Sequence, residues 1–151
     1  MTPAGRALSA ARGAGFTARS WLENDGDLAV QDQAALRVGF IGPKGERRFG
    51  LDAWRGVVLK GKGAADAFAS ACATADLVIV AARIPVPRDG CQVIDQALLA
   101  QTGGLAIWPQ VDGTLRLDPT RRARRLWNSA GPTPKVVWRL TLPTLRLAKD
   151  Q

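Results

Sequence analysis

The two cysteines, Cys72 and Cys91, carry the most reactive side chains in this sequence. Their separation does not match the Cys-x-x-Cys spacing of dithiol redox sites, and two thiols alone do not complete a zinc site. A buried thiol packs like a small apolar side chain, so two free buried cysteines are one expectation. A disulfide is the other, and on the chain-entropy model it would stabilise the fold by roughly 3 kcal/mol.

Arginines and tryptophans alternate near the C-terminus. Residues 116–151 hold 9 basic and 2 acidic side chains, whereas the whole chain has 21 basic and 13 acidic ones. Cations bind phosphates and indoles stack on unpaired bases, which is the chemistry of single-stranded nucleic-acid binding. A solvated basic edge, which is the favoured interpretation, and a surface for anionic lipid headgroups are the alternatives. The candidate DNA-contacting residues are Arg121, Arg122, Arg124, Arg125, Trp127, Lys135 and Arg139.

The sequence contains neither histidine nor tyrosine. Their absence removes the commonest metal ligand and the commonest general base, so we expect no catalytic residue, metal site or cofactor in this chain. The carboxylates of Glu23, Asp25 and Asp27 lack the later bidentate glutamate of a calcium loop, and an ordinary acidic turn is expected there. Asp76 and Asp95 flank predicted strand ends without a nucleophile or base beside them.

Apolar runs separated by glycine and proline predict an α/β or α+β fold, in which a mixed, layered sheet is covered by helices. A short strand or helical turn is expected at 16–22, a hairpin over 36–51 around a turn at 42–45, and a brief strand at 57–59. A helix over 64–75, after a turn at 61–63, leads to a buried strand at 77–82. A strand at 93–94, a helix at 96–101 and a hairpin around Asp112-Gly113 follow. A peripheral strand at 136–140 would be added to the sheet.

The length of 151 residues corresponds to one domain. We expect it to span residues 1–128, with an extended basic tail at 129–151. The chain shows neither a signal peptide pattern nor an apolar run of transmembrane length.

Four dispersed motifs suggest a family. They are FTARSWLENDGD at 16–27, CATADLVIV at 72–80, Cys91 followed by VID at 93–95, and RRLW at 124–127. In order and spacing they resemble the C-terminal end of the ComEC-type competence proteins of alphaproteobacteria, which are DNA-internalisation channels. The resemblance covers roughly residues 5–128. It places these motifs in the last portion of a metallo-β-lactamase-like domain and implies that the chain is part of a longer protein.

Departures from the family pattern bear on its chemistry. Family members often carry a further cysteine pair around positions 40–45, where this sequence has none, and residues 129–151 match nothing in the pattern. A metallo-β-lactamase site needs histidine and aspartate ligands, and a chain without histidine cannot build it.

The resemblance implies a location at the periplasmic face of the inner membrane, beside the transmembrane channel portion of the same system. In that oxidising compartment Cys72 and Cys91 would be joined. The expected function is a non-catalytic domain of a DNA-uptake system, acting as a scaffold or as a contact surface for single-stranded DNA. The alternatives are a part of a metal-dependent hydrolase or nuclease whose metal site lies outside this chain, and a small interaction module. A homo-oligomer would be one way to supply missing strands.

Overall fold

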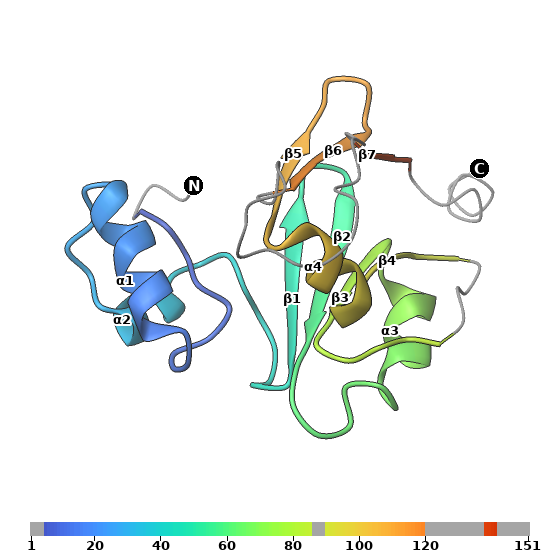
Figure 1. Cartoon of the computed structure of the whole chain (residues 1–151), viewed down its shortest axis with the longest axis horizontal. Coiled ribbons are helices and arrows are strands. Elements are labelled where there is room, and N and C mark those ends of the chain that lie inside the picture. Colours follow the sequence, from blue (N-terminus) through green and yellow to red (C-terminus); the bar gives the residue numbers. More distant parts are fainter. Residues whose placement is uncertain (1–4, 86–89, 120–137, 142–151) are drawn as a thin grey trace, which may run out of the picture.

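The computed structural model describes residues 5–85, 90–119 and 138–141, and its fold is α+β. Figure 1 shows a helical N-terminal unit at the left, a mixed sheet in the centre and a second sheet at the top. The expectation of mixed sheets accompanied by helices is confirmed. Within the described part of the chain, no helix has the length and apolar character needed to cross a membrane.

The central sheet has four strands in the order β1-β2-β3-β4. They are β1 (Glu46–Leu51), β2 (Trp54–Leu59), β3 (Leu77–Val80) and β4 (Gln92–Ile94). The first two are antiparallel and joined by a two-residue turn in which Asp52 adopts a positive φ of 54°. The pairs β2–β3 and β3–β4 are parallel. Because a parallel pair needs a crossover, the chain between β2 and β3 contains helix α3 (Phe68–Thr74).

The predicted hairpin over 36–51 is wrong in its first strand. Only one bridge, Ile41 to Arg48, joins the two segments, and β1 pairs along its whole length with β2 instead. Burial explains the choice, because Val57 and Leu59 of β2 are enclosed whereas Leu36 and Val38 remain 88% and 85% exposed. Apolar character alone does not make a strand when pairing brings no burial.

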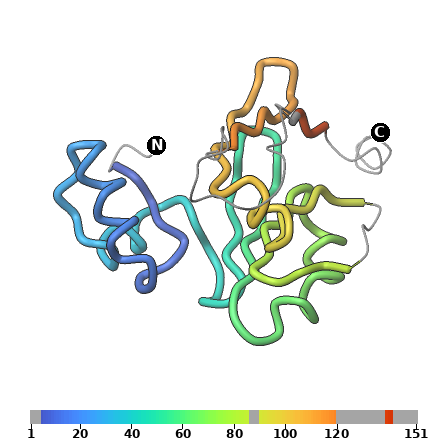
Figure 2. Tube along the Cα trace, viewed as in Figure 1, coloured from blue at the N-terminus to red at the C-terminus, as the bar shows by residue number. Residues whose placement is uncertain are grey.

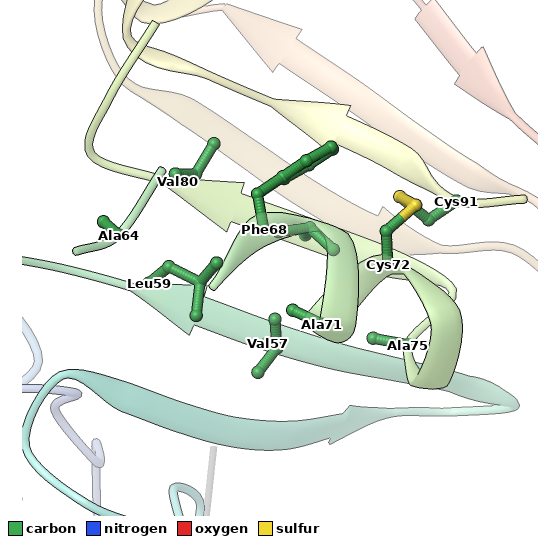
Figure 3. Packing of buried hydrophobic residues seen from close by; sticks show 10 residues of the cluster. Val57, Leu59, Ala64, Phe68, Ala71, Cys72, Ala75, Val80 and Cys91 are labelled. Carbon is green, nitrogen blue, oxygen red and sulfur yellow. A yellow bond between two sulfur atoms is a disulfide. The ribbon is translucent and has the colours of Figure 1, made fainter. Parts of the chain in front are cut away.

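Helix α3 is shorter than the predicted 64–75 and covers one face of the central sheet. Its buried residues Phe68, Ala71 and Cys72 share a core cluster with Val57 and Leu59 of β2, and the Cys72 side chain points toward Cys91 (Figure 3). Residues 64–67, which precede the helix, form turns. The helix spacing of four residues between Phe68 and Cys72 therefore does place both side chains in the core.

A disulfide joins α3 to the residue that precedes β4. The sulfurs of Cys72 and Cys91 are bonded, with a Cα–Cα distance of 5.3 Å and a sequence separation of 19 (Figure 3). Both residues are buried in the core cluster between α3 and the sheet. The pairing predicted for an oxidising compartment is thus confirmed in the structure.

The opposite face of the central sheet packs against helix α4 (Gln96–Thr102) and a second sheet. This antiparallel sheet has the order β5-β6-β7, with β5 (Leu105–Pro109), β6 (Leu115–Pro119) and β7 (Trp138–Leu140). The predicted hairpin around Asp112-Gly113 is confirmed, with Gly113 at a φ of 76°. The predicted strand at 136–140 is found over 138–140, at the edge of this sheet, while 136–137 lie outside the described residues. Figure 2 shows how the chain passes from the central sheet through α4 into this second sheet.

Trp54 ties the two sheets together. It is 2% exposed and shares a core cluster with Leu77 and Ile94 of the central sheet and with Leu115 and Leu117 of β6. Its indole N–H donates a hydrogen bond to the carbonyl oxygen of Gly113, with a donor–acceptor distance of 2.9 Å. A buried indole needs such a partner, and here the partner belongs to the turn of the second sheet.

The N-terminal unit contains α1 (Gly15–Asn24) and α2 (Gln31–Ala35), with Leu22 and Ala34 buried. Ion pairs hold its loops. Arg37 forms a bidentate contact with the carboxylate of Asp27 and also donates to the backbone oxygen of Arg6. Because guanidinium and carboxylate are matched planar groups, this contact fixes the loop between the two helices.

The Asp27 carboxylate predicts an acid-sensitive step in this unit. The Arg37 guanidinium, with help from the backbone N–H of Ala29, holds the pKa of Asp27 well below its usual range. A carboxyl group whose pKa is lower in the folded than in the unfolded state stabilises the fold. The stabilisation is complete at pH values above the pKa of the unfolded chain, near 3.9, and is lost as the pH falls through the pKa of the folded state. We expect wild type to exceed Asp27→Asn in thermal stability at neutral pH and the difference to shrink below about pH 4.

Thermal melts followed by circular dichroism between pH 2 and 7 would measure this difference. Asp32→Asn is the control, because Asp32 lies on exposed α2 surface and forms no ion pair among the described residues. Parallel pH profiles for wild type and Asp27→Asn would contradict the assignment.

Candidate nucleic-acid interface

The outer face of the second sheet carries a row of one indole and two guanidinium groups. In the strand register Trp108 of β5 lies opposite Arg116 of β6, and Arg116 lies opposite Arg139 of β7. Directly paired residues project to the same face of a sheet. Their sequence neighbours Leu115, Leu117 and Leu140 project the other way, into the core shared with Trp54. The alternation of apolar and polar residues along β6 thus places the row on the face away from this core, where the side chain of Arg116 is 43% exposed although its Nε atom is buried.

The indole of Trp108 is available to a ligand, since the residue is 51% exposed. An exposed tryptophan on an antiparallel sheet, next to arginines, provides the stacking platform and the cations that unpaired nucleotides need. Trp108 lies two residues from the hairpin loop that also contains the fully exposed Val111.

Carboxylates accompany both arginines of the row. Arg116 contacts Asp118 at 3.1 Å and Arg139 contacts Asp112 at 3.2 Å. The hydroxyl and the backbone N–H of Thr114 lower the pKa of Asp112, so this carboxylate stays charged. Solvent-exposed pairs of this kind contribute at most about 1 kcal/mol each, so a phosphate can replace the carboxylate as the partner of Arg139 at little cost.

Arg139 is the one predicted DNA-contacting residue within the described residues, where it is exposed on β7. The other six, Arg121, Arg122, Arg124, Arg125, Trp127 and Lys135, lie outside the described residues. In sequence they all belong to the connection between β6 and β7, the two strands that carry Arg116 and Arg139.

Sequence reasoning missed Trp108 and Arg116. The signal was present, because the Asp112-Gly113 turn fixes the register of the hairpin and a two-residue period assigns each side chain to a face. Applying that period to the predicted hairpin would have placed Trp108 opposite Arg116 on the polar face.

The remaining candidates hold structural roles. Glu23, Asp25 and Asp27 each form an ion pair with an arginine, as befits an acidic turn. Among the described residues, no group of three or more histidine, cysteine, aspartate or glutamate side chains could hold a metal ion.

Two carboxylates at strand ends bind backbone groups. Asp76, 2% exposed, precedes β3 and accepts hydrogen bonds from the backbone N–H and the guanidinium of Arg55 in β2. Asp95 caps α4 by accepting from the backbone N–H of Leu98 at 2.8 Å. These contacts agree with the interpretation of both as turn residues.

Comparisons of the chain with models of protein families, with curated proteins and with solved structures find no match.

Proposed function

We propose that this chain is a non-catalytic domain of a DNA-uptake system and that the outer face of the β5-β6-β7 sheet contacts single-stranded DNA. The observation that carries the proposal is the row formed by Trp108, Arg116 and Arg139 on an exposed sheet face. The connection between β6 and β7 adds four arginines at 121–125 to the same part of the sequence. Cations and an exposed indole within one sheet favour unpaired nucleotides, because the bases of a duplex are not free to stack on a side chain.

The resemblance to ComEC-type proteins supplies the rest of the proposal. In this hypothesis the mixed sheet β1–β4 with α3 corresponds to the last part of a metallo-β-lactamase-like domain, attached to a transmembrane channel portion. The Cys72–Cys91 disulfide supports a location at the periplasmic face of the inner membrane, because disulfides persist in oxidising compartments and are rare in the cytosol.

Trp108→Ala should weaken binding of a fluorescent thymidine oligonucleotide by about 5- to 150-fold, because stacking of a base on an aromatic side chain contributes about 1–3 kcal/mol. Fluorescence anisotropy would measure it. Trp21→Ala is the matched control, since Trp21 is also about half exposed, at 54% against 51%, but belongs to α1. Both substitutions remove an exposed indole, so the stability of the fold should change little in either.

The salt dependence provides a second measurement. Affinity should fall steeply between about 50 mM and 200 mM salt, and Arg139→Gln should make that fall shallower, since each phosphate contact contributes to the slope. Arg19→Gln, which removes another exposed, ion-paired arginine, is the control.

Equal losses of oligonucleotide affinity in Trp108→Ala and Trp21→Ala would contradict the assigned surface. Nuclease activity of the purified chain with stoichiometric Zn²⁺ or Mn²⁺ would contradict the non-catalytic role.

A further inference from the structure

A cavity lined by basic residues lies where the N-terminal unit meets the central sheet. Its volume is about 710 Å³, within the range of small-molecule sites. Three separate segments form its wall: the loop at 9–13 that precedes α1, residues 44, 45 and 47 at the start of β1, and residues 60–61 directly after β2. The cavity is on a different part of the fold from the Trp108 face.

The charge of the lining is entirely positive. Arg12, Lys44, Arg47 and Lys60 line the cavity, and no aspartate or glutamate does. The nearest carboxylate in sequence, that of Glu46, is paired with Arg48, and these two residues project to the opposite side of β1 from Arg47. A bound anion would therefore meet four cations without a competing carboxylate.

The distribution of ion pairs sets these cations apart. Seven arginines of the described chain pair with carboxylates, and none of them lines the cavity. Within the described ranges, the basic residues that form no ion pair are Arg12, Lys44, Arg47, Lys60, Lys62 and Arg83. Four of these six thus line one cavity.

Two of the cations are held in place by uncharged partners. The ammonium group of Lys60 donates to the hydroxyl of Ser9 at 3.0 Å, and the guanidinium of Arg47 donates to the carbonyl oxygen of Gly42 at 2.8 Å. The Nε atom of Arg47 is buried and has no partner among the described residues. Neutral partners orient these groups without cancelling their charge, and an unsatisfied guanidinium donor is costly unless another interaction offsets it.

Glycines open the rim of the cavity. Gly13 and Gly61 have φ angles of 86° and 84°, and a Cβ at either position would meet no atom within 4 Å. The positive φ, rather than a lack of space, is what requires glycine here. The backbone at both positions can therefore approach a ligand without an intervening side chain.

We infer that this cavity binds a phosphate group with at least two negative charges, such as a phosphomonoester or a diphosphate. Several cations converging from three segments match a compact polyanion better than a single carboxylate, and guanidinium groups bind phosphate oxygens in pairs. The inference does not depend on the proposed DNA contact at Trp108, because the two sites share no residue.

Inorganic pyrophosphate is the probe for the test, with amide shifts in NMR spectra of the whole chain as the readout. We expect pyrophosphate to shift the amide signals of Gly13, Gly45 and Gly61, and Lys60→Gln to weaken its binding about tenfold, as the loss of one charge-assisted contact does. Lys62→Gln is the matched control, since Lys62 is two residues away and does not line the cavity. Its binding should stay within about twofold of wild type, because an exposed charge outside the site is screened by salt.

A second variant tests pyrophosphate binding without changing the segment next to β2. Arg12→Gln changes only the loop before α1 and should weaken pyrophosphate binding to a similar degree as Lys60→Gln. Equal weakening by Lys62→Gln, or shifts that avoid all three glycines, would overturn the inference. Trp108→Ala should leave pyrophosphate binding unchanged, which separates this result from that of the DNA experiment.

Two further arms identify the source of the phosphate. A 5′-phosphorylated thymidine oligonucleotide compared with its unphosphorylated form tests a nucleotide terminus. Phosphatidic acid vesicles, whose headgroup is a phosphomonoester, compared with phosphatidylcholine vesicles test a lipid headgroup. The phosphate compound that binds should bind Lys60→Gln more weakly than wild type and Lys62→Gln as tightly as wild type. If both compounds bind the two variants with equally reduced affinity, a dedicated site is excluded.

Discussion

Exchange of both cysteines for alanine, Cys72→Ala with Cys91→Ala, is expected to lower the free energy of unfolding by about 3 kcal/mol. The bond closes a loop with a sequence separation of 19, and on the chain-entropy model opening it restores that much freedom to the unfolded chain. Urea denaturation of the oxidised wild type and of the double variant, followed by tryptophan fluorescence, would measure the difference.

Reductant provides the control for the disulfide. Wild type should lose a similar amount of stability when the bond is reduced before denaturation, whereas the double variant should not respond. Equal midpoints for oxidised wild type and for the double variant would show that the bond adds no stability.

Trp54→Ala is expected to cost about 3–5 kcal/mol, the range for truncation of a large aromatic residue in a core. Trp54 is 2% exposed and packs between the central sheet and β6. Its loss leaves a cavity between the sheets and removes the hydrogen bond to the carbonyl oxygen of Gly113. Denaturant unfolding gives the stability, and hydrogen exchange at the amides of β5 and β6 reports whether the second sheet opens separately.

Trp54→Phe separates packing from hydrogen bonding. Phenylalanine keeps most of the buried ring area but cannot donate to Gly113, so its cost should be nearer about 1–2 kcal/mol. A cost for Trp54→Ala below about 1 kcal/mol, or exchange in β5 and β6 that does not change, would show that the sheets do not depend on this contact.

Short sequence motifs predicted those helices and strands whose ends are determined by turn or capping residues next to them. The Asp112-Gly113 turn fixed the hairpin of β5 and β6, and the apolar run before Pro85 marked β3. Helix α4 was predicted because glycines at 103–104 close it, and the structure adds that Asp95 caps its start. The positions of the two cysteines, near the end of a helix and before a strand, left free thiols and a disulfide both open, and the bond was expected only from the oxidising compartment that the family resemblance implies.

The other features of the fold and of the two sites depend on contacts between residues that are far apart in the sequence. Leu36 and Val38 look like strand residues, yet β1 gains more burial from β2, which the Asp52 turn brings alongside it. The row of Trp108, Arg116 and Arg139 needs the pairing of β7 with β6, which joins residues separated by the connection at 120–137. The basic cavity likewise combines residues 12, 44, 47 and 60, whose convergence no short motif announces.

The Cys72–Cys91 bond also changes the outcome of a break in the backbone. Arg83, an exposed residue, lies between the two cysteines in sequence, within the connection from β3 to β4. A peptide bond hydrolysed there would yield two polypeptides that remain one covalent molecule, because the disulfide still links α3 to the residue before β4. Strand β4, α4 and the second sheet would thus stay attached to strands β1, β2 and β3 of the central sheet after cleavage. In a compartment that contains proteases, this connection can be cut without releasing the outer face that carries Trp108.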